Sequence, residues 1–227
     1  MDMKTLSAAY VRGYMKRTGA SLKEEMLLKK ELYDLSAEEI DRLIAIGRQK
    51  DLKLYRFKEK AELARVHKVM GFLKGVRPEN LLDVGSGRGA FLFPFLCEFE
   101  GVETVSYDLL DYRVEFINDL ARGGIGNVKA EIKDLVTLEE EKRYDVVTLL
   151  EVLEHIPEAE KAVFAAVRAA KRYVVVTVPD KPDNNPEHIH LLTKERLKEM
   201  FTRAGAVNLR FDGVNGHLFM IAGVERK

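Results

Sequence analysis

One stretch of the sequence carries most of the information about the architecture of this protein: Leu81-Leu82-Asp83-Val84-Gly85-Ser86-Gly87-Arg88-Gly89-Ala90. An apolar run enters a loop with three glycines, and an apolar, helix-like segment follows. We expect a buried parallel strand, a tight turn and then a helix. Glycine lets the backbone turn sharply and lets a ligand approach closely, and the helix directs its positive N-terminal end toward that ligand. The stretch therefore predicts a site for a nucleotide-like molecule.

The glycine loop alone leaves several interpretations open. The spacing Gly85-x-Gly87-x-x-Ala90 also satisfies the loose dinucleotide-binding fingerprint, which would make the protein a nicotinamide-dependent oxidoreductase. A tight strand-to-helix turn needs no ligand. A protein that binds a cofactor without catalysing a reaction would carry the same loop. The acidic residues that surround the loop favour one further interpretation.

Three acidic residues accompany the predicted strands. Asp83 lies inside the strand before the loop, Asp108 ends a second strand, and Asp134 follows a third. Over about residues 77–227 this combination resembles the class I S-adenosylmethionine-dependent methyltransferases. The resemblance implies that Asp83 and the glycine loop hold the methionine end of S-adenosylmethionine, that Asp108 accepts hydrogen bonds from both ribose hydroxyls, and that adenine lies at Asp134. It implies these cofactor-binding residues: Asp83, Gly85, Ser86, Gly87, Gly89, Asp108, Asp134 and Leu135.

The predicted elements alternate after residue 77. Strands are expected at 80–84, 104–107, 128–132, 144–149, 172–178, 206–211 and 217–224, with helices at about 89–99, 111–122, 158–169 and 194–204. Apolar runs such as Val174-Val175-Val176 indicate strands that are covered on both faces. We expect an α/β fold with a doubly wound, mostly parallel, seven-stranded Rossmann-like sheet whose last strand is antiparallel, because only a hairpin loop precedes that strand.

Residues 1–76 form a predicted helical region that is distinct in charge from the domain at 77–227. They carry 17 Lys or Arg and 11 Asp or Glu, a net charge of +6, and the remainder of the chain has a net charge of −6. Capping boxes at Ser21 and Ser36 open two amphipathic helices, and a long helix is expected over 52–73, which Pro78 limits. The charge asymmetry fits either an anionic partner or attraction between the two regions.

The amino-acid composition limits the class of protein and its cellular location. The 227 residues are 46% hydrophobic, enough for a sizeable core, and the single Cys97 excludes an intrachain disulfide bond. No apolar run approaches the length that spans a bilayer, so no membrane partner is expected. The sequence that starts Met1-Asp2-Met3-Lys4 lacks the apolar region of a signal peptide, and we expect a cytoplasmic protein.

A second motif, Glu151-Val152-Leu153-Glu154-His155-Ile156-Pro157, follows the fourth predicted strand. In a helical turn, Glu151, Glu154 and His155 would share one side and could act as a base and orienting groups or as part of a metal shell for Mn²⁺ or Mg²⁺. The motif resembles the metal-dependent small-RNA 3′-terminal ribose 2′-O-methyltransferases. That resemblance implies His188 as the last ligand, counted back from Thr193, with His190 as a substitute.

The same motif is also widespread in metal-free methyltransferases that act on small molecules, including quinone-pathway O-methyltransferases. The chain departs from the small-RNA family at Asp180 and at Asp183-Asn184-Asn185-Pro186. We therefore expect O-methylation of a hydroxylated small molecule, with metal-dependent methylation of an RNA 3′ end and a non-catalytic cofactor-binding role as alternatives.

Overall fold

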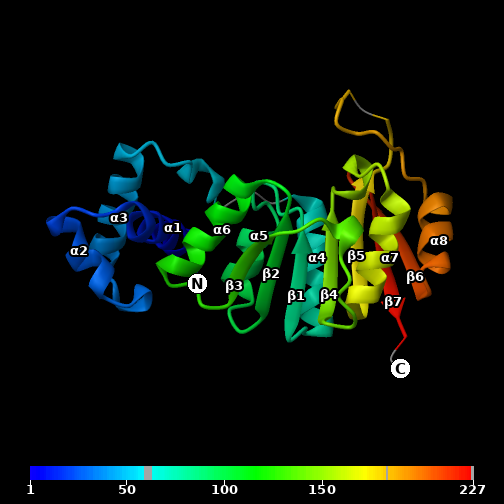
Figure 1. Cartoon of the computed structure of the whole chain (residues 1–227), viewed down its shortest axis with the longest axis horizontal. Coiled ribbons are helices and arrows are strands. Elements are labelled where there is room, and N and C mark those ends of the chain that lie inside the picture. Colours follow the sequence, from blue (N-terminus) through cyan, green and yellow to red (C-terminus); the bar gives the residue numbers. More distant parts are fainter. Residues whose placement is uncertain (59–62, 183, 226–227) are drawn as a thin grey trace.

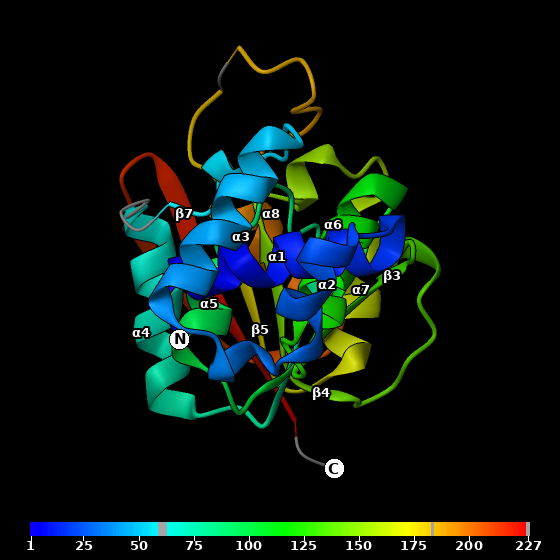
Figure 2. The same ribbon diagram turned by 90° about the vertical axis from the view of Figure 1, so that its left-hand side faces the viewer.

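The protein forms one continuous sheet with helices on both faces (Figures 1 and 2). The structure is a computed structural model that describes residues 1–58, 63–182 and 184–225. The sheet has the order β3-β2-β1-β4-β5-β7-β6, in which β7 alone runs antiparallel to its two neighbours. Its strands are β1 (Asn80–Val84), β2 (Glu103–Asp108), β3 (Val128–Ile132), β4 (Tyr144–Leu150), β5 (Ala170–Pro179), β6 (Ala206–Val214) and β7 (His217–Val224). The predicted seven-stranded, mostly parallel sheet is confirmed.

The helices divide between the two faces of the sheet. The α-helices are α1 (Met3–Thr18), α2 (Leu22–Lys29), α3 (Ala37–Gln49), α4 (Ala64–Val76), α5 (Leu92–Glu98), α6 (Asp111–Gly123), α7 (Ala159–Ala169) and α8 (Lys194–Arg203). Helices α4 and α5 pack on one face of the central strands, and α7 packs on the other (Figure 2). Helix α8 contributes to the same core as α7. Short 3₁₀ turns are η1 (Leu32–Asp34), η2 (Leu54–Arg56), η3 (Leu135–Thr137) and η4 (Leu153–His155). Because the central strands are buried on both faces, their carboxyl ends and the following loops carry the accessible polar groups.

Two expected helices differ from the structure. The helix predicted at 89–99 begins only at Leu92, because Gly89 has a φ of 82°, which no right-handed helix accommodates. The helix predicted over 52–73 is wrong in its first part, where the 3₁₀ turn η2 is followed by Phe57. That ring stacks on Phe93 at a centroid distance of 4.8 Å, so the chain bends toward the core. Residues 59–62, within that predicted helix, and Asp183 lie outside the described residues.

The N-terminal helices pack at the β3 end of the sheet, where α1 crosses α6 (Figure 1). Glycines allow backbone contact at this crossing: a Cβ on Gly13 would lie 1.7 Å from the carbonyl oxygen of Asp119, and one on Gly123 would lie 1.7 Å from that of Ala9. The buried Arg12 side chain also donates to the Gly123 carbonyl at 3.1 Å. The basic N-terminal region thus shares a core with α6.

None of the helices in the described part of the chain has the length and hydropathy that a membrane-spanning segment needs.

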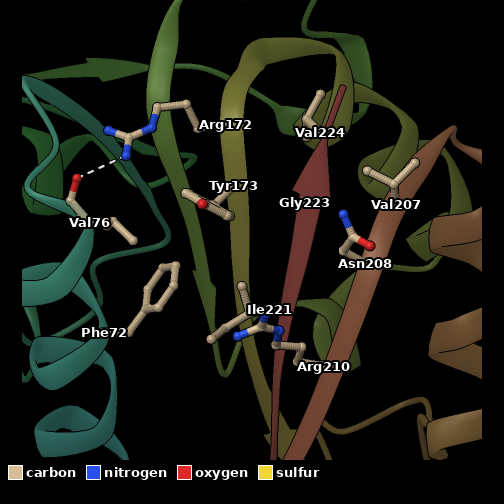
Figure 3. Close-up of a pocket in the computed structure, with 10 residues that line it drawn as sticks. All are labelled: Phe72, Val76, Arg172, Tyr173, Val207, Asn208, Arg210, Ile221, Gly223 and Val224. Atoms are coloured by element: carbon tan, nitrogen blue, oxygen red, sulfur yellow. Dashed lines mark hydrogen bonds between the residues drawn. The ribbon is translucent and has the colours of Figure 1, made fainter. Parts of the chain in front are cut away.

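A cavity of about 310 Å³ lies far from the glycine loop, at the amino end of β5 (Figure 3). Phe72, Tyr173, Arg172 and Arg210 contribute to its wall. The Arg172 guanidinium is already engaged there, since it donates to the Val76 carbonyl at 2.9 Å. In sheets of this type ligands bind at the carboxyl ends of the strands, so we place the functional site at the opposite edge.

Candidate cofactor and acceptor site

The loop between β1 and α5 accepts only glycine at its key positions. Gly85, Gly87 and Gly89 have φ values of 66°, 57° and 82°, in the left-handed region. A Cβ on Gly85 would lie 2.9 Å from Val152 Cγ2, and one on Gly89 would lie 2.3 Å from the Phe93 ring. The loop therefore needs glycine for its conformation and for close packing, as a cradle for a ligand does.

Asp83 lies at the carboxyl end of β1 and is 2% exposed. Its carboxylate accepts hydrogen bonds from Ser86 Oγ at 2.5 Å and from Thr148 Oγ1 at 2.7 Å. Burial raises the pKa of Asp83 to about 6, although these two hydrogen bonds oppose the shift. A buried carboxylate with this environment gains stability when a cation, such as the ammonium group of a methionine moiety, comes to lie beside it.

A cavity of about 170 Å³ opens beside the loop, and Asp83, Gly85 and Glu151 are among the residues that line it. Arg65 from α4 and Arg88 from the loop also line it. Guanidinium groups bind carboxylates well, so this cavity offers both charges that a zwitterionic amino acid moiety requires. Arg65 has no local sequence signal that marks it as a site residue, because only the packing of α4 on the sheet brings it to the loop.

The predicted ribose and adenine positions follow β2 and β3. Asp108 is 5% exposed, accepts a hydrogen bond from the Leu110 backbone N–H at 3.0 Å and lies 3.4 Å from Arg113 Nη1. Asp134 is exposed and caps η3 by accepting from the Val136 N–H at 2.9 Å, whereas Leu135 is buried.

Two further apolar side chains stand at these strand ends. Leu109, which directly follows β2, is 64% exposed, and Ile132, the last residue of β3, is 59% exposed. Exposed apolar groups beside acidic side chains suit the faces and edges of a nucleoside. Neither residue can be recognised as a site residue from the sequence, because each has the pattern of an ordinary strand end.

Three of the four predicted metal ligands lie close together in space, two from the turn after β4 and one from the segment after β5. Glu154, His155 and His188 each place one donor atom within 4.8 Å of the others, and Glu154 is fully buried. His155 Nδ1 lies 2.9 Å from the Glu187 carbonyl oxygen, which can only accept, so Nδ1 carries a proton and the lone pair of the neutral ring is on Nε2. His190, the predicted substitute ligand, does not join this cluster, because its Nε2 donates to the Ile156 carbonyl oxygen at 3.0 Å.

Glu151 lies apart from this cluster. The helical turn expected over 151–155 does not form: Glu151 has a φ of 59°, and a 3₁₀ turn covers only Leu153–His155. Its Oε2 atom lies 2.9 Å from His217 Nδ1, and its Oε1 atom lies 3.9 Å from Arg65 Nε. The structure thus divides the predicted catalytic residues into two groups, Glu154 with His155 and Glu151 with a histidine from β7.

Comparison with known proteins identifies the class. Residues 52–210 match a family model described as a methyltransferase domain. Over 95 residues, 41% of this chain, the sequence is 33% identical to a ubiquinone biosynthesis O-methyltransferase from Nitrosospira multiformis, and this match spans 39% of that protein. With its fold and glycine loop, the chain belongs to the class I S-adenosylmethionine-dependent methyltransferases.

Solved structures agree with this fold. A methyltransferase from Archaeoglobus fulgidus covers 79% of this chain and 98% of its own length, with a TM-score of 0.57 and 18% identity. Magnesium protoporphyrin IX methyltransferase from Synechocystis, solved with S-adenosylhomocysteine, covers 88% and 92% with a TM-score of 0.55 and 13% identity. The methyltransferase domain of bacterial CtHen1-CN covers 70% and 97%, with a TM-score of 0.56 and 18% identity. The resemblance to the small-RNA enzymes stays a prediction.

The cradle fits S-adenosylmethionine on chemical grounds. Asp83 would face its ammonium group, Arg65 or Arg88 its carboxylate, and Asp108 its ribose. When bound, this cofactor supplies a methyl group on a positively charged sulfur that is a good leaving group.

Proposed function

We propose that this methyltransferase acts on a hydroxyl oxygen of a small molecule. The observation that carries the proposal is the cluster of Glu154, His155 and His188, which includes two residues of the turn after β4. A hydroxyl is a weak nucleophile until it is oriented and loses its proton, and a carboxylate–imidazole cluster meets those needs. The O-methyltransferase activity named for the curated relative supports the same choice.

In this proposal the protein's residues chiefly position the reactants. His155 offers the lone pair of Nε2 to the acceptor hydroxyl, and the Glu187 carbonyl holds the ring in the tautomer that makes this possible. Backbone N–H groups of Ile189 and His190 donate to the Glu154 carbonyl at 3.0 and 3.3 Å, so the loop that carries His188 is tied to the turn after β4. Alignment of nucleophile and methyl group supplies most of the rate enhancement in such a displacement.

A second candidate is metal-dependent methylation of an RNA 3′-terminal ribose. One carboxylate and two imidazoles within 4.8 Å form a donor set that suits Mn²⁺, Fe²⁺ or Zn²⁺ better than Mg²⁺. The contact from His155 to a backbone carbonyl is the outer contact that metal-bound histidines usually make. A metal ion held by these residues would lower the pKa of a coordinated hydroxyl.

One assay tests both candidates. Transfer of the labelled methyl group from S-adenosylmethionine is measured to 3,4-dihydroxybenzoate, to aniline and thiophenol, and to an RNA oligonucleotide with a free 3′-terminal diol, each with EDTA or with Mn²⁺. Transfer to the catechol that His188→Ala weakens and His67→Ala leaves unchanged supports the proposal. Transfer only to the RNA, and only with metal, supports the second candidate. Transfer confined to aniline or thiophenol contradicts both.

A further inference from the structure

We propose that the cavity at the amino end of β5 binds a small aromatic molecule that carries a single carboxylate, at a site separate from that of the reactants. The cavity lies between α4 and the strands β5, β7 and β6 (Figure 3). Its volume of about 310 Å³ falls at the lower end of the range for small-molecule sites. The described residues that line it include none of those that line the cavity beside the glycine loop.

One side of the cavity is aromatic. Phe72 from α4 and Tyr173 from β5 meet edge to face, with ring centroids 5.2 Å apart and an interplanar angle of 88°. Val76 and Ile221 continue this apolar surface. Because both rings are only partly buried, a flat aromatic group can cover ring and methyl surface that otherwise faces water.

The opposite side is formed by a bulged segment of β6. Val207 pairs with Gly223 of β7, and Arg210 pairs with Ile221, so β6 has one residue more than β7 over this interval. Asn208, inside the interval, has a φ of 53°, which asparagine adopts more readily than most residues. The extra residue is the defining feature of a β-bulge, which can turn a side chain toward a site.

The bulge determines the face on which Arg210 lies. Side chains alternate along a regular strand, so without the extra residue Arg210 would share a face with the buried Ala206. Instead, Leu209 and Phe211 pack on the core that includes Ala206, and Arg210 lines the cavity on the other face. Figure 3 shows its side chain reaching from β6 over β7. The strand irregularity therefore brings a cation to the cavity.

The lining of the cavity is positively charged. Arg172 and Arg210 belong to it, and the described residues that line it include no acidic side chain. The Arg210 side chain forms no hydrogen bond or ion pair in the described part of the chain. The charge of Arg172 is partly offset, because its Nη1 lies 3.7 Å from a carboxylate oxygen of Asp145. About one positive charge is left without a partner, which suits a carboxylate better than a doubly charged phosphate.

The polar and apolar parts of the cavity together define the ligand. Arg210 can donate two hydrogen bonds to a carboxylate, and the Asn208 amide beside it can donate a third. The aromatic side then receives the ring of the same molecule. This site does not depend on which acceptor is methylated.

Titration of trans-cinnamate into protein with labelled isoleucine methyl groups, followed by NMR, tests the proposal. S-adenosylhomocysteine is present throughout, so that the cofactor cavity is occupied. We expect cinnamate to shift the Ile221 methyl signals in a saturable way and to leave those of Ile132, at the end of β3, unchanged. Cinnamamide, which has the same shape without the charge, should bind about 10-fold more weakly, and inorganic phosphate should leave Ile221 unchanged.

Variants assign the binding to this cavity. Arg210→Gln should weaken cinnamate binding about 10-fold, and Phe72→Leu should weaken it by a few fold. Arg42→Gln, which alters an exposed arginine of α3, should match wild type. Because Arg210 is exposed and lacks a partner in the described part of the chain, its substitution should leave the midpoint of thermal unfolding unchanged.

Four results would overturn the inference. The absence of a saturable Ile221 shift at millimolar cinnamate would show that the cavity is not a site for such anions. Equal affinities for cinnamate and cinnamamide would remove the role of the charge. Binding that is lost in Arg65→Gln and kept in Arg210→Gln would place cinnamate in the cofactor cavity. A dimer that Arg210→Glu dissociates would make this face an interface between two copies of the chain.

Discussion

Replacing Asp83 by asparagine tests why a buried carboxylate is kept beside the glycine loop. Burial raises the pKa of this group from 3.8 to about 6. The folded protein therefore binds the proton more tightly than the unfolded chain. The stabilising contribution is complete below pH 3.8 and is lost as the pH rises through about 6.

The change in the free energy of unfolding follows from the size of this pKa shift. A difference of about 2 pKa units, at about 1.4 kcal/mol per unit, means that ionised Asp83 lowers the free energy of unfolding by about 3 kcal/mol at pH 7.5. The same relation gives about half of that at pH 5. Asparagine does not titrate, so the stability of Asp83→Asn relative to wild type should be higher at pH 7.5 than at pH 5, by about 1 kcal/mol.

Urea denaturation of both proteins without cofactor, at pH 7.5 and pH 5, measures this difference. Using the change with pH removes the constant contribution from altered hydrogen bonds to Ser86 and Thr148. In parallel, Asp83→Asn should bind S-adenosylhomocysteine at least about 10-fold more weakly, because the charge that faces the ammonium group is gone. A relative stability that stays constant with pH, or that changes in the opposite direction, would refute the reasoning.

Three glycine substitutions and one control substitution, Gly101→Ala, give further tests, all read by urea denaturation or by S-adenosylhomocysteine titration. Gly13→Ala would place a Cβ 1.7 Å from a backbone oxygen of α6, so the protein should lose at least about 1–3 kcal/mol of stability; an unchanged midpoint contradicts the α1–α6 crossing. Gly71→Ala, in α4 with no atom within 4 Å, should instead gain up to about 1 kcal/mol, and a loss contradicts the expected helix propensity effect. Gly89→Ala should abolish cofactor binding because its Cβ would meet Phe93, whereas Gly101→Ala should bind normally; retained binding in Gly89→Ala contradicts the cradle.

The sequence predicts those parts of the site that depend on the residue pattern of one short segment of the chain. Asp83 and Gly85 belong to one strand-to-turn segment, and Asp108 ends a strand whose apolar pattern is plain, so their places in the sheet follow from periodicity and strand order. Their contacts with the cofactor stay predictions. The bend at Phe57 was not predictable, because its ring completes a cluster with Phe93 that forms only in the folded protein.

The arrangement of the residues on the acceptor side depends more on tertiary contacts than the arrangement of the cofactor-binding residues does. The grouping of Glu154 and His155 with His188 agrees with the motif. By contrast, the pairing of Glu151 with His217 depends on the antiparallel register between β5 and β7, and no local pattern specifies a register between distant segments. The left-handed backbone at Glu151 is likewise imposed by its neighbours, since a glutamate on its own disfavours it.

We propose that the loop after β1 and the acid at the end of β2 bind S-adenosylmethionine. Isothermal titration of S-adenosylhomocysteine into wild type, Asp108→Asn and the control Asp111→Asn tests it most directly. Asp108 is buried at the strand end, whereas Asp111 is exposed in the first turn of α6. We predict one site in wild type and in Asp111→Asn, and a loss of affinity of about 100-fold in Asp108→Asn, since the negative charge and one of the two acceptor oxygens for the ribose hydroxyls are lost. No binding to wild type, or equal binding to all three proteins, would contradict the account.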